Sequence, residues 1–221
     1  MVNGGRRFFS ILLVVISIVV IGLVGYLAYD YISNYLIAKD AAKTVDEFEN
    51  QIIVVAVDDE NTVDEVTNTT VETPSNNNNN NNTNKTSTVK YKGYNVIGTI
   101  QIPKTKVKYP IVDDISTDAM DRAIVMLYGP GLNQIGNTVI AGHNYRNGGF
   151  FGNNKKLELG DKIYITDAYG NKVEYTITNK YLTTDTDFEY ASRNTQGKRE
   201  ISLSTCTSDA SKRLVIWAKE S

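Results

Sequence analysis

The feature that most constrains the fold is the stretch of 21 residues from Phe8 to Ala28, which contains no charged side chain. An α-helix needs about 20 apolar residues to cross a bilayer. Arg6 and Arg7 come directly before the stretch, and Asp30 follows it. Because basic residues favour the cytoplasmic side, the sequence predicts one transmembrane helix, with the N-terminus in the cytoplasm and the rest of the chain outside the cell.

Two alternatives to this membrane helix are weaker. A cleaved signal peptide has an apolar region of about 7–15 residues and a cleavage site of small residues. Here the apolar run is longer and is followed by Tyr29, Asp30, Tyr31 and Ile32. A buried helix of a soluble domain is also disfavoured, because the run is so long and lies so near the N-terminus. We therefore predict four segments: a cytoplasmic N-terminus (residues 1–7), a signal-anchor helix (8–28), an extracellular linker (29–89) and a folded domain (90–221).

The predicted linker is acidic at its start and rich in asparagine further on, with seven consecutive asparagines at residues 76–82. Such a polar tract buries too little apolar surface to offset the entropy lost on ordering. The sequence therefore predicts a flexible tether. Two parts of it differ in composition: residues 41–50 could be helical, and residues 51–57 form a short apolar run of strand-like composition.

The folded domain is dominated by strand signals. Residues Tyr169, Gly170 and Asn171 form a hairpin turn signal between two of the predicted strands. Residues 118–127 and 150–157 are candidate short helices or single turns. Seven or so short strands with few helices indicate an all-β barrel or sandwich. The predicted strands are residues 94–102, 106–112, 138–143, 162–167, 172–180, 200–206 and 213–219.

The domain is mildly basic, and the linker before it is acidic. Such a balance suits a domain beside an anionic cell wall. The excess of basic residues is too small to indicate a nucleic-acid partner.

Cys206 is the only cysteine of the chain and ends the strand-like run 201–206. A single cysteine in an exported protein forms an intermolecular bridge or is a reactive thiol. Cysteines in general are more often buried and inert, so the neighbouring residues must decide between these possibilities.

Two further residues make acyl transfer chemically possible. Arg213 follows after a six-residue connection, and a hairpin would place it beside Cys206; His143, the only histidine, ends the run 138–143. A thiol becomes a strong nucleophile as thiolate, and a histidine can carry the proton to and from the reacting amine. An arginine stays charged and offers donors to a developing oxyanion.

The residues around these three side chains resemble the sortase family. The motif Leu203-Ser204-Thr205-Cys206, the later Arg213 and the upstream Ala141-Gly142-His143-Asn144 carry the resemblance. The family pattern at the nucleophile is Thr-Leu-x-Thr-Cys, and Ser202 replaces its first threonine. Segments 97–103, 109–112 and 159–163 are also similar to the family, so the resemblance covers about residues 89–221.

The resemblance implies a closed eight-stranded β-barrel with short helices, preceded by a transmembrane helix and a linker. It also implies a membrane-bound transpeptidase of a Gram-positive bacterium. Such an enzyme cleaves the Thr–Gly bond of a C-terminal sorting signal similar to Leu-Pro-x-Thr-Gly on secreted proteins. It then transfers the acyl group to an amine of a peptidoglycan precursor or of a pilin lysine.

The resemblance also implies roles for individual residues. Cys206 would be the nucleophile that forms the acyl-enzyme, and His143 the general acid and base. Arg213 would hold the substrate or its oxyanion, and Thr205 would line the substrate groove.

The subclass stays open. The motif Leu-Ser-Thr-Cys and the His143-Asn144 pair lean toward class B. Class B sortases usually carry a long helical insertion before the cysteine strand, whereas here only residues 181–198 are available.

Asp185, Asp187 and Glu189 lie in that same loop. Some class A sortases bind calcium with acidic residues around it. We expect a solvated acidic loop here, and we predict no metal and no other cofactor.

Other functions fit less well. An L,D-transpeptidase has a Ser-His-Gly-Cys motif, which is absent from this sequence, and papain-like hydrolases have their cysteine before their histidine. A membrane-tethered β-barrel that binds cell-wall components without catalysis, with Cys206 buried and inert, is the remaining alternative.

Overall fold

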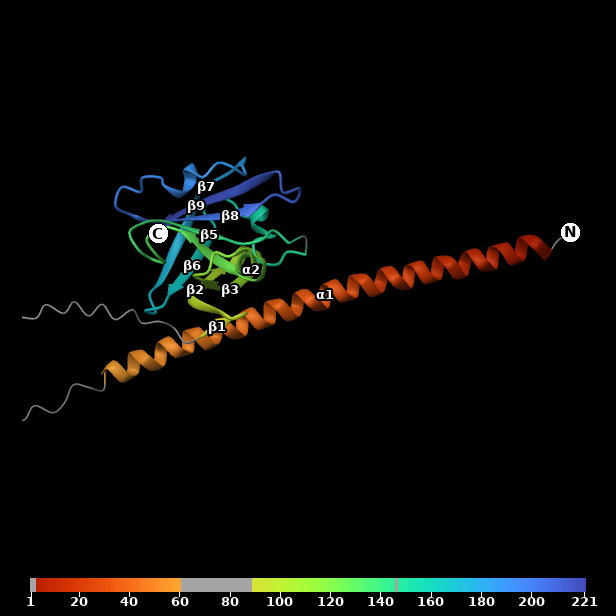
Figure 1. Ribbon diagram of the computed structural model, residues 1–221, viewed down its shortest axis with the longest axis horizontal. Coiled ribbons are helices and arrows are strands. Elements are labelled where there is room, and N and C mark those ends of the chain that lie inside the picture. Colours follow the sequence, from red (N-terminus) through yellow and green to blue (C-terminus); the bar gives the residue numbers. More distant parts are fainter. Residues whose placement is uncertain (1–2, 61–88, 146) are drawn as a thin grey trace, which may run out of the picture.

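The structure is a computed structural model that describes residues 3–60, 89–145 and 147–221. One long helix is followed by a domain composed mostly of strands (Figure 1). The helices are α1 (Asn3–Glu60), α2 (Thr117–Arg122) and the short 3-10 turns η1 (Pro103–Thr105), η2 (Asn154–Lys156) and η3 (Glu189–Ala191). The strands are β1 (Lys90–Tyr91), β2 (Tyr94–Ile102), β3 (Val107–Val112), β4 (Ile124–Tyr128), β5 (Gly136–Ala141), β6 (Lys162–Asp167), β7 (Lys172–Thr184), β8 (Arg199–Cys206) and β9 (Lys212–Glu220).

The strands close into a barrel. Their order is β1-β2-β3-β4-β5-β8-β9-β7-β6, and an additional pairing of β2 with β6 joins the two ends. Ile100 of β2 lies opposite Ile165 of β6 in this closing pair. Strand β1 pairs only with β2 and lies outside the closed ring. The predicted eight-stranded closed barrel is therefore confirmed.

Two apolar clusters hold the strands. The larger cluster includes the fully buried side chains of Ile111, Ile140 and Leu203. A smaller cluster joins Val139 and Val215 to Tyr190 of η3. Residues that are adjacent in sequence within β5, and likewise within β9, thus belong to different clusters. Strand β8 is buried from its second to its seventh residue, and this double burial explains why its sequence is almost continuously apolar or small.

The seven predicted strands are all present, but the prediction for residues 118–127 was wrong in its second half. Helix α2 ends at Arg122, and β4 begins at Ile124. Ile124 and Val125 pair in parallel with β3, and Val125 also pairs with Ala141 of β5. Pairing with two strands distant in sequence overrides the weak helical pattern. The second candidate, residues 150–157, contains the single turn η2.

Helix α1 extends well beyond the predicted membrane segment. Residues 29–60 of the predicted linker are helical, including residues 51–57, for which a strand was considered. Residues 61–88 of that linker, with the asparagine run, lie outside the described residues. Ala41, Val45 and Phe48 are completely buried, and their spacing of four and three residues places them on one face of the helix.

Charged side chains flank this buried face of α1. Asp40 pairs with Lys92 at 2.6 Å, and Asp46 pairs with Lys108 of β3 at 2.7 Å. The Gln101 side chain donates a hydrogen bond to Glu49 at 3.2 Å. The barrel therefore rests on the C-terminal half of α1, with β1, β2 and β3 nearest the helix (Figure 1).

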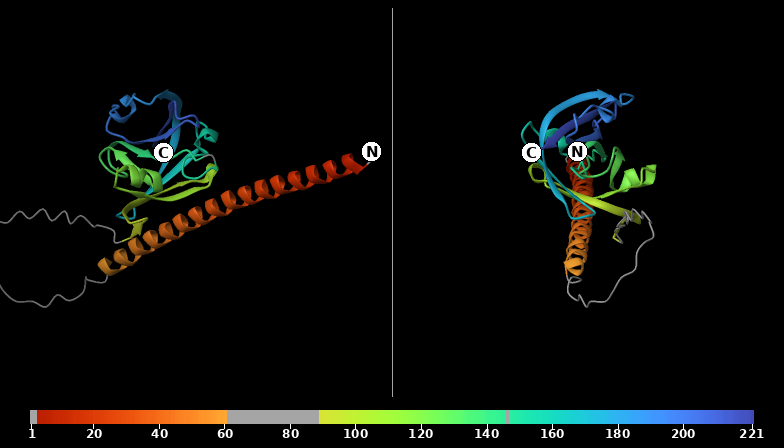
Figure 2. Two further views of the ribbon diagram at one scale, coloured as in Figure 1. Left: turned by 45° about the vertical axis from the view of Figure 1, so that its right-hand side comes forward. Right: turned by 90° about the vertical axis from the view of Figure 1, so that its left-hand side faces the viewer.

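The N-terminal half of α1 projects away from the barrel (Figure 2). Its apolar N-terminal segment is not buried against the rest of the protein. By length and composition, this helix could cross a membrane.

Candidate active site

Cys206 and Arg213 face each other across two neighbouring strands. Cys206 ends β8, Arg213 is the second residue of β9, and the two are direct partners in the antiparallel register. On its other side, Arg213 pairs with Thr183 of β7. The hairpin predicted from the six-residue connection is therefore present, and it brings the thiol and the guanidinium together.

The turn between β8 and β9 is stabilised by its own side chains. The Thr207 amide donates to the Lys212 carbonyl at 2.8 Å, and the Thr207 hydroxyl donates to Asp209 at 2.6 Å. Asp209 also accepts from the Ser211 amide at 3.2 Å. These hydrogen bonds lower the pKa of Asp209 to about 2, and the one from the Thr207 hydroxyl has the largest effect. An ionised Asp209 thus holds the turn that keeps Cys206 beside Arg213.

His143 lies two residues beyond the end of β5, next to Gly142. A Cβ atom at position 142 would lie 3.0 Å from the ring of Phe151, so the close packing at this position favours glycine. The His143 Nε2 atom lies 2.8 Å from the carboxylate of Asp121 on α2. Both side chains are partly exposed, His143 at 39% and Asp121 at 59%. The carboxylate therefore fixes the imidazole orientation at the pocket rim.

Asn144 and Tyr145 attach the histidine segment to its surroundings. The Asn144 side-chain amide donates to the backbone carbonyl of Cys206 at 2.9 Å. The Tyr145 hydroxyl donates to the backbone carbonyl of Asp121 at 2.8 Å, and its ring lies 5.4 Å from the His143 ring. Burial, followed by the nearby Asp121 carboxylate, raises the pKa of Tyr145. The histidine segment is thus tied both to the cysteine strand and to α2.

One pocket of about 200 Å³ is lined by His143, Cys206 and Arg213 together, and also by Asp121 and Thr205. Cys206 is a free, half-buried cysteine. Thr205 is 4% exposed, and among the described residues its hydroxyl has no hydrogen-bond partner. A buried hydroxyl without a hydrogen-bond partner costs free energy. The Thr205 hydroxyl borders a pocket, where a bound ligand could accept or donate that hydrogen bond.

A second pocket, of about 290 Å³, also reaches Cys206. It is lined by Lys155, Lys180 and Leu182, and by Thr205 and Cys206. The Lys180 ammonium is held by the backbone carbonyl of Leu157 at 2.6 Å. The thiol therefore lies between two cavities, and both sides of the cysteine are accessible to a bound chain.

The loop between β7 and β8 covers Arg213. The Arg213 Nε atom donates to the Asp185 carbonyl at 3.3 Å, and the guanidinium lies 5.4 Å from the centre of the Phe188 ring. Asp187 accepts hydrogen bonds from the Thr183 hydroxyl and from the Glu189 amide, which lower its pKa. The Asp187 carboxylate thus stabilises the local structure of this loop.

Across residues 3–60, 89–145 and 147–221, no cluster of three or more histidine, cysteine, aspartate or glutamate side chains is arranged to hold a metal ion.

The structure brings together all four residues that the sequence singled out, Thr205, Cys206, His143 and Arg213, at one pocket. Asp121 could not be found from the sequence, because it lies 22 positions before His143 and no local pattern links the two residues. Asn144 was visible in the sequence only as part of the family motif. The contact of Asn144 with the Cys206 carbonyl gives that motif a physical reason.

The comparisons with known proteins agree with this geometry. A sequence profile described as the sortase domain matches residues 100–221, more than half of the chain. The chain therefore belongs to the sortase family. No curated protein matches the sequence.

Several solved sortase structures are similar to this one. Sortase A from Corynebacterium diphtheriae is 28% identical with a TM-score of 0.53, and the match covers 58% of this chain and 61% of that one. This chain thus spans less than two thirds of the Corynebacterium protein. A pilus-related sortase C of Group B Streptococcus is also 28% identical, with a TM-score of 0.52, over 57% of this chain and 67% of that one.

A Clostridium perfringens sortase D5 transpeptidase has the same fold over more of the chain. The match covers 83% of this chain and 99% of that one, with a TM-score of 0.59 and 24% identity. The three neighbours carry three different sortase class letters, so the likeness leaves the subclass open.

Proposed function

We propose that this protein is a membrane-anchored cysteine transpeptidase that cleaves a sorting signal similar to Leu-Pro-x-Thr-Gly and transfers the acyl group to a cell-wall or pilin amine. The observation that carries the proposal is the cross-strand pairing of Cys206 with Arg213 at a pocket that His143 also lines. A half-exposed free thiol in such a pocket disfavours the alternative of a non-enzymatic barrel with an inert core cysteine.

In the first half of the reaction, the proton of the Cys206 thiol passes to His143, and the sulfur attacks the carbonyl carbon of the Thr–Gly bond. An S–C bond forms, the C–N bond breaks, and the imidazolium of His143 gives its proton to the leaving amine. The product is a thioester on Cys206 and a free glycine amine. The partly exposed position of His143 at the pocket rim suits this exchange of protons with an arriving and a departing group.

In the second half, an acceptor amine attacks the thioester carbonyl. A C–N bond forms, the S–C bond breaks, and His143 takes the proton that the amine loses. The thiolate of Cys206 is the leaving group. Water in place of the amine gives hydrolysis instead of transfer, so the acceptor must compete with water at the same carbon.

Arg213 and Thr205 would stabilise the negative charge that develops on the carbonyl oxygen. The guanidinium is fixed by the Asp185 carbonyl and by the Phe188 ring, so it is preorganised. The Thr205 hydroxyl, which has no hydrogen-bond partner within the part of the chain that the structure describes, is available as a second donor at the pocket wall.

Asp121 would act as a positioning residue through its hydrogen bond to His143 Nε2. This contact leaves the other ring nitrogen for proton transfer in the pocket.

The N-terminal half of α1 would hold the enzyme in the membrane. The exposed apolar residues of segment 8–28 suit a bilayer span, and the basic residues Arg6 and Arg7 favour the cytoplasmic side for the residues before it. The barrel would then lie outside the cell, where secreted proteins with a C-terminal sorting signal and amine acceptors meet it.

The proposal is tested with the full chain in detergent micelles and a fluorescence-quenched peptide that contains Leu-Pro-x-Thr-Gly. The unaltered chain should cleave the peptide after threonine, and added triglycine should appear as a transfer product. Cys206→Ala should abolish both products, whereas Cys206→Ser should retain at most a trace. Cleavage that persists in Cys206→Ala would refute the proposal.

A further inference from the structure

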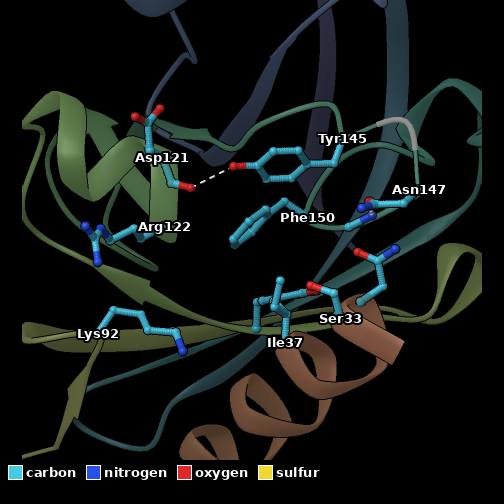
Figure 3. A pocket seen from close by; sticks show the side chains of 11 residues that line it. Ser33, Ile37, Lys92, Asp121, Arg122, Tyr145, Asn147 and Phe150 are labelled. Carbon is cyan, nitrogen blue, oxygen red and sulfur yellow. Dashed lines mark hydrogen bonds between the residues drawn. The ribbon is translucent and has the colours of Figure 1, made fainter. Parts of the chain in front are cut away.

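A third cavity lies between helix α1 and the barrel, and none of the steps above uses it. It measures about 410 Å³. Helix α1 contributes Ser33, Asn34 and Ile37 to its wall, and the barrel side contributes Tyr145 and Phe150 (Figure 3). We call this cavity the helix–barrel cleft. Its volume is typical of sites that bind small ligands.

The cleft adjoins the catalytic pocket through Asp121. This residue lines both cavities, and its carboxylate binds His143 on the catalytic side. The Tyr145 hydroxyl reaches the Asp121 carbonyl from within the cleft, as Figure 3 shows. A ligand in the cleft would therefore have one end next to the histidine that exchanges protons with the incoming amine.

The cleft is also close to the predicted membrane segment. Ser33 follows Ala28 by five residues, which is about 7.5 Å along an α-helix. Ser33, Asn34 and Ile37 are partly buried, whereas Tyr35 and Leu36 between them are exposed. The face of α1 nearest the barrel thus leads from the membrane surface into the cleft.

The lining of the cleft suits a peptide with polar groups. The rings of Tyr109, Phe150 and Tyr145 form a continuous aromatic wall, with centroid distances of 5.0 and 5.5 Å between successive rings. The side chains of Asn34 and Asn147 place amide groups beside that wall. Flat aromatic faces with nearby amides bind groups that are partly apolar and partly hydrogen-bonding.

Two cations border the same cleft, and each already has a carboxylate partner. Arg122 pairs with Asp118 at 2.8 Å, and Lys92 pairs with Asp40 at 2.6 Å. Asp121 adds one further carboxylate to the lining, beside His143, so the cleft presents no concentration of unpaired positive charge. This balance favours an acceptor recognised by its peptide groups over one recognised by a dense negative charge.

We infer that the helix–barrel cleft binds the second substrate, and that this substrate is the amine-bearing peptide of a membrane-linked cell-wall precursor. The inference rests on the proposed function, because it assigns a place to the acceptor of that reaction. The precursor would approach along α1, place its peptide against the aromatic wall, and present its amine past Asp121 to the thioester on Cys206. Its amine then loses a proton to His143 as the C–N bond forms and the S–C bond breaks.

The test compares transfer with hydrolysis for the full chain in lipid vesicles. The donor is the Leu-Pro-x-Thr-Gly peptide, and the acceptor is triglycine coupled through its carboxyl end to a phospholipid of the same vesicles. Mass spectrometry measures the ratio of the transfer product to the hydrolysis product. Soluble triglycine and a lysine-containing pilin peptide serve as further acceptors.

Asn34→Trp should fill the cleft and lower the transfer-to-hydrolysis ratio at least fivefold. Leu36→Trp is the matched control, because it adds the same ring two residues away on an exposed position of the same helix. Asn34→Ala adds no bulk and should lower the transfer-to-hydrolysis ratio by a smaller factor. This variant separates the loss of the Asn34 amide from a disturbance of the helix. Thermal unfolding of each variant checks that α1 is still docked.

Each outcome decides between distinct claims. An unchanged ratio in a folded Asn34→Trp variant would overturn the cleft assignment while leaving the transpeptidase proposal in place. An equal fall of hydrolysis and transfer would show that the cleft serves the first substrate, which also overturns the assignment. Equal use of soluble and lipid-linked triglycine, or preference for the pilin peptide, would overturn the membrane-linked acceptor. No cleavage by the unaltered chain would refute the proposed function itself.

Discussion

The barrel and helix α1 are held in place by different kinds of contact. The barrel is a closed ring of backbone ladders around a buried apolar core. Cys206 on β8 and Arg213 on β9 lie on neighbouring strands of that ring, and His143 follows β5, the strand on the other side of β8. Helix α1 is attached by one apolar face and by exposed charge pairs at its sides. The geometry of the proposed chemistry therefore depends on strand register, whereas the position of α1 depends on a few side chains.

This difference predicts that the two regions can be disturbed separately. Changes at the ends of β8 and β9 should alter catalysis while α1 stays docked. Changes on the buried face of α1 should weaken docking while the thiol chemistry persists.

The largest effect should come from Arg213→Lys. A lysine keeps the charge but cannot reproduce the planar fork, and loss of a preorganised oxyanion donor costs about 10²–10³ in rate. We expect kcat/KM for peptide cleavage to fall by that factor. Arg199→Lys is the matched control, because Arg199 begins β8 and pairs with Glu220 at 2.8 Å. Full activity in Arg213→Lys would remove the oxyanion role from this residue.

The next effect concerns docking of α1. Phe48 is completely buried against the barrel, and truncation of such a ring costs about 3–5 kcal/mol. Phe48→Ala should therefore release α1 and increase amide hydrogen exchange in β3, while peptide hydrolysis is retained. Tyr35→Ala, at an exposed position of the same helix, is the control and should leave exchange unchanged. Loss of hydrolysis together with docking would show that the barrel site depends on α1.

Asp121→Asn should have a smaller effect, which concerns the catalytic rate of the barrel and not the docking of α1. The substitution weakens the hydrogen bond that orients His143, and we expect kcat to fall about tenfold, equivalent to about 1.4 kcal/mol. The KM of the peptide should change little, because the carboxylate acts through the imidazole. Asp121→Glu should restore part of the rate. Asp113→Asn, an exposed carboxylate before α2, is the control. A fall of equal size in that control would contradict a positioning role for Asp121.

The smallest effect should come from the charge pair between Lys108 and Asp46. Both side chains are partly exposed, and such pairs contribute less than about 1 kcal/mol and are screened by salt. A double-mutant cycle with Lys108→Ala and Asp46→Ala, followed by thermal unfolding, measures the coupling. A coupling well above this value at high salt would mean that α1 is held mainly by charge and not by its buried apolar face.

The parts of the fold that depend on residues close together along the chain could be predicted from the sequence. The run before Cys206 and the run after Arg213 are separated by a short polar connection, so a hairpin followed from the sequence, and the register confirms it. Strand β4 was missed, because its pairing with β3 and β5 depends on residues far away in sequence.

The long helix shows a different limit of sequence analysis. Ala41, Val45 and Phe48 have helical spacing, but they lie among charged residues that suggested a spacer. Only the presence of the barrel surface shows that these three side chains have something to pack against. Likewise, the contact between Asp121 and His143 arises from tertiary structure and has no local pattern in the sequence.

The most direct test of the central claim is the mass of the intact protein after a brief reaction with the sorting-signal peptide and an acid quench. We expect an added mass equal to the acyl part of the peptide, located on Cys206 and removed by hydroxylamine. The adduct should be absent from Cys206→Ala and should accumulate when no amine acceptor is present. Peptide cleavage without any adduct on Cys206 would contradict covalent catalysis by this residue.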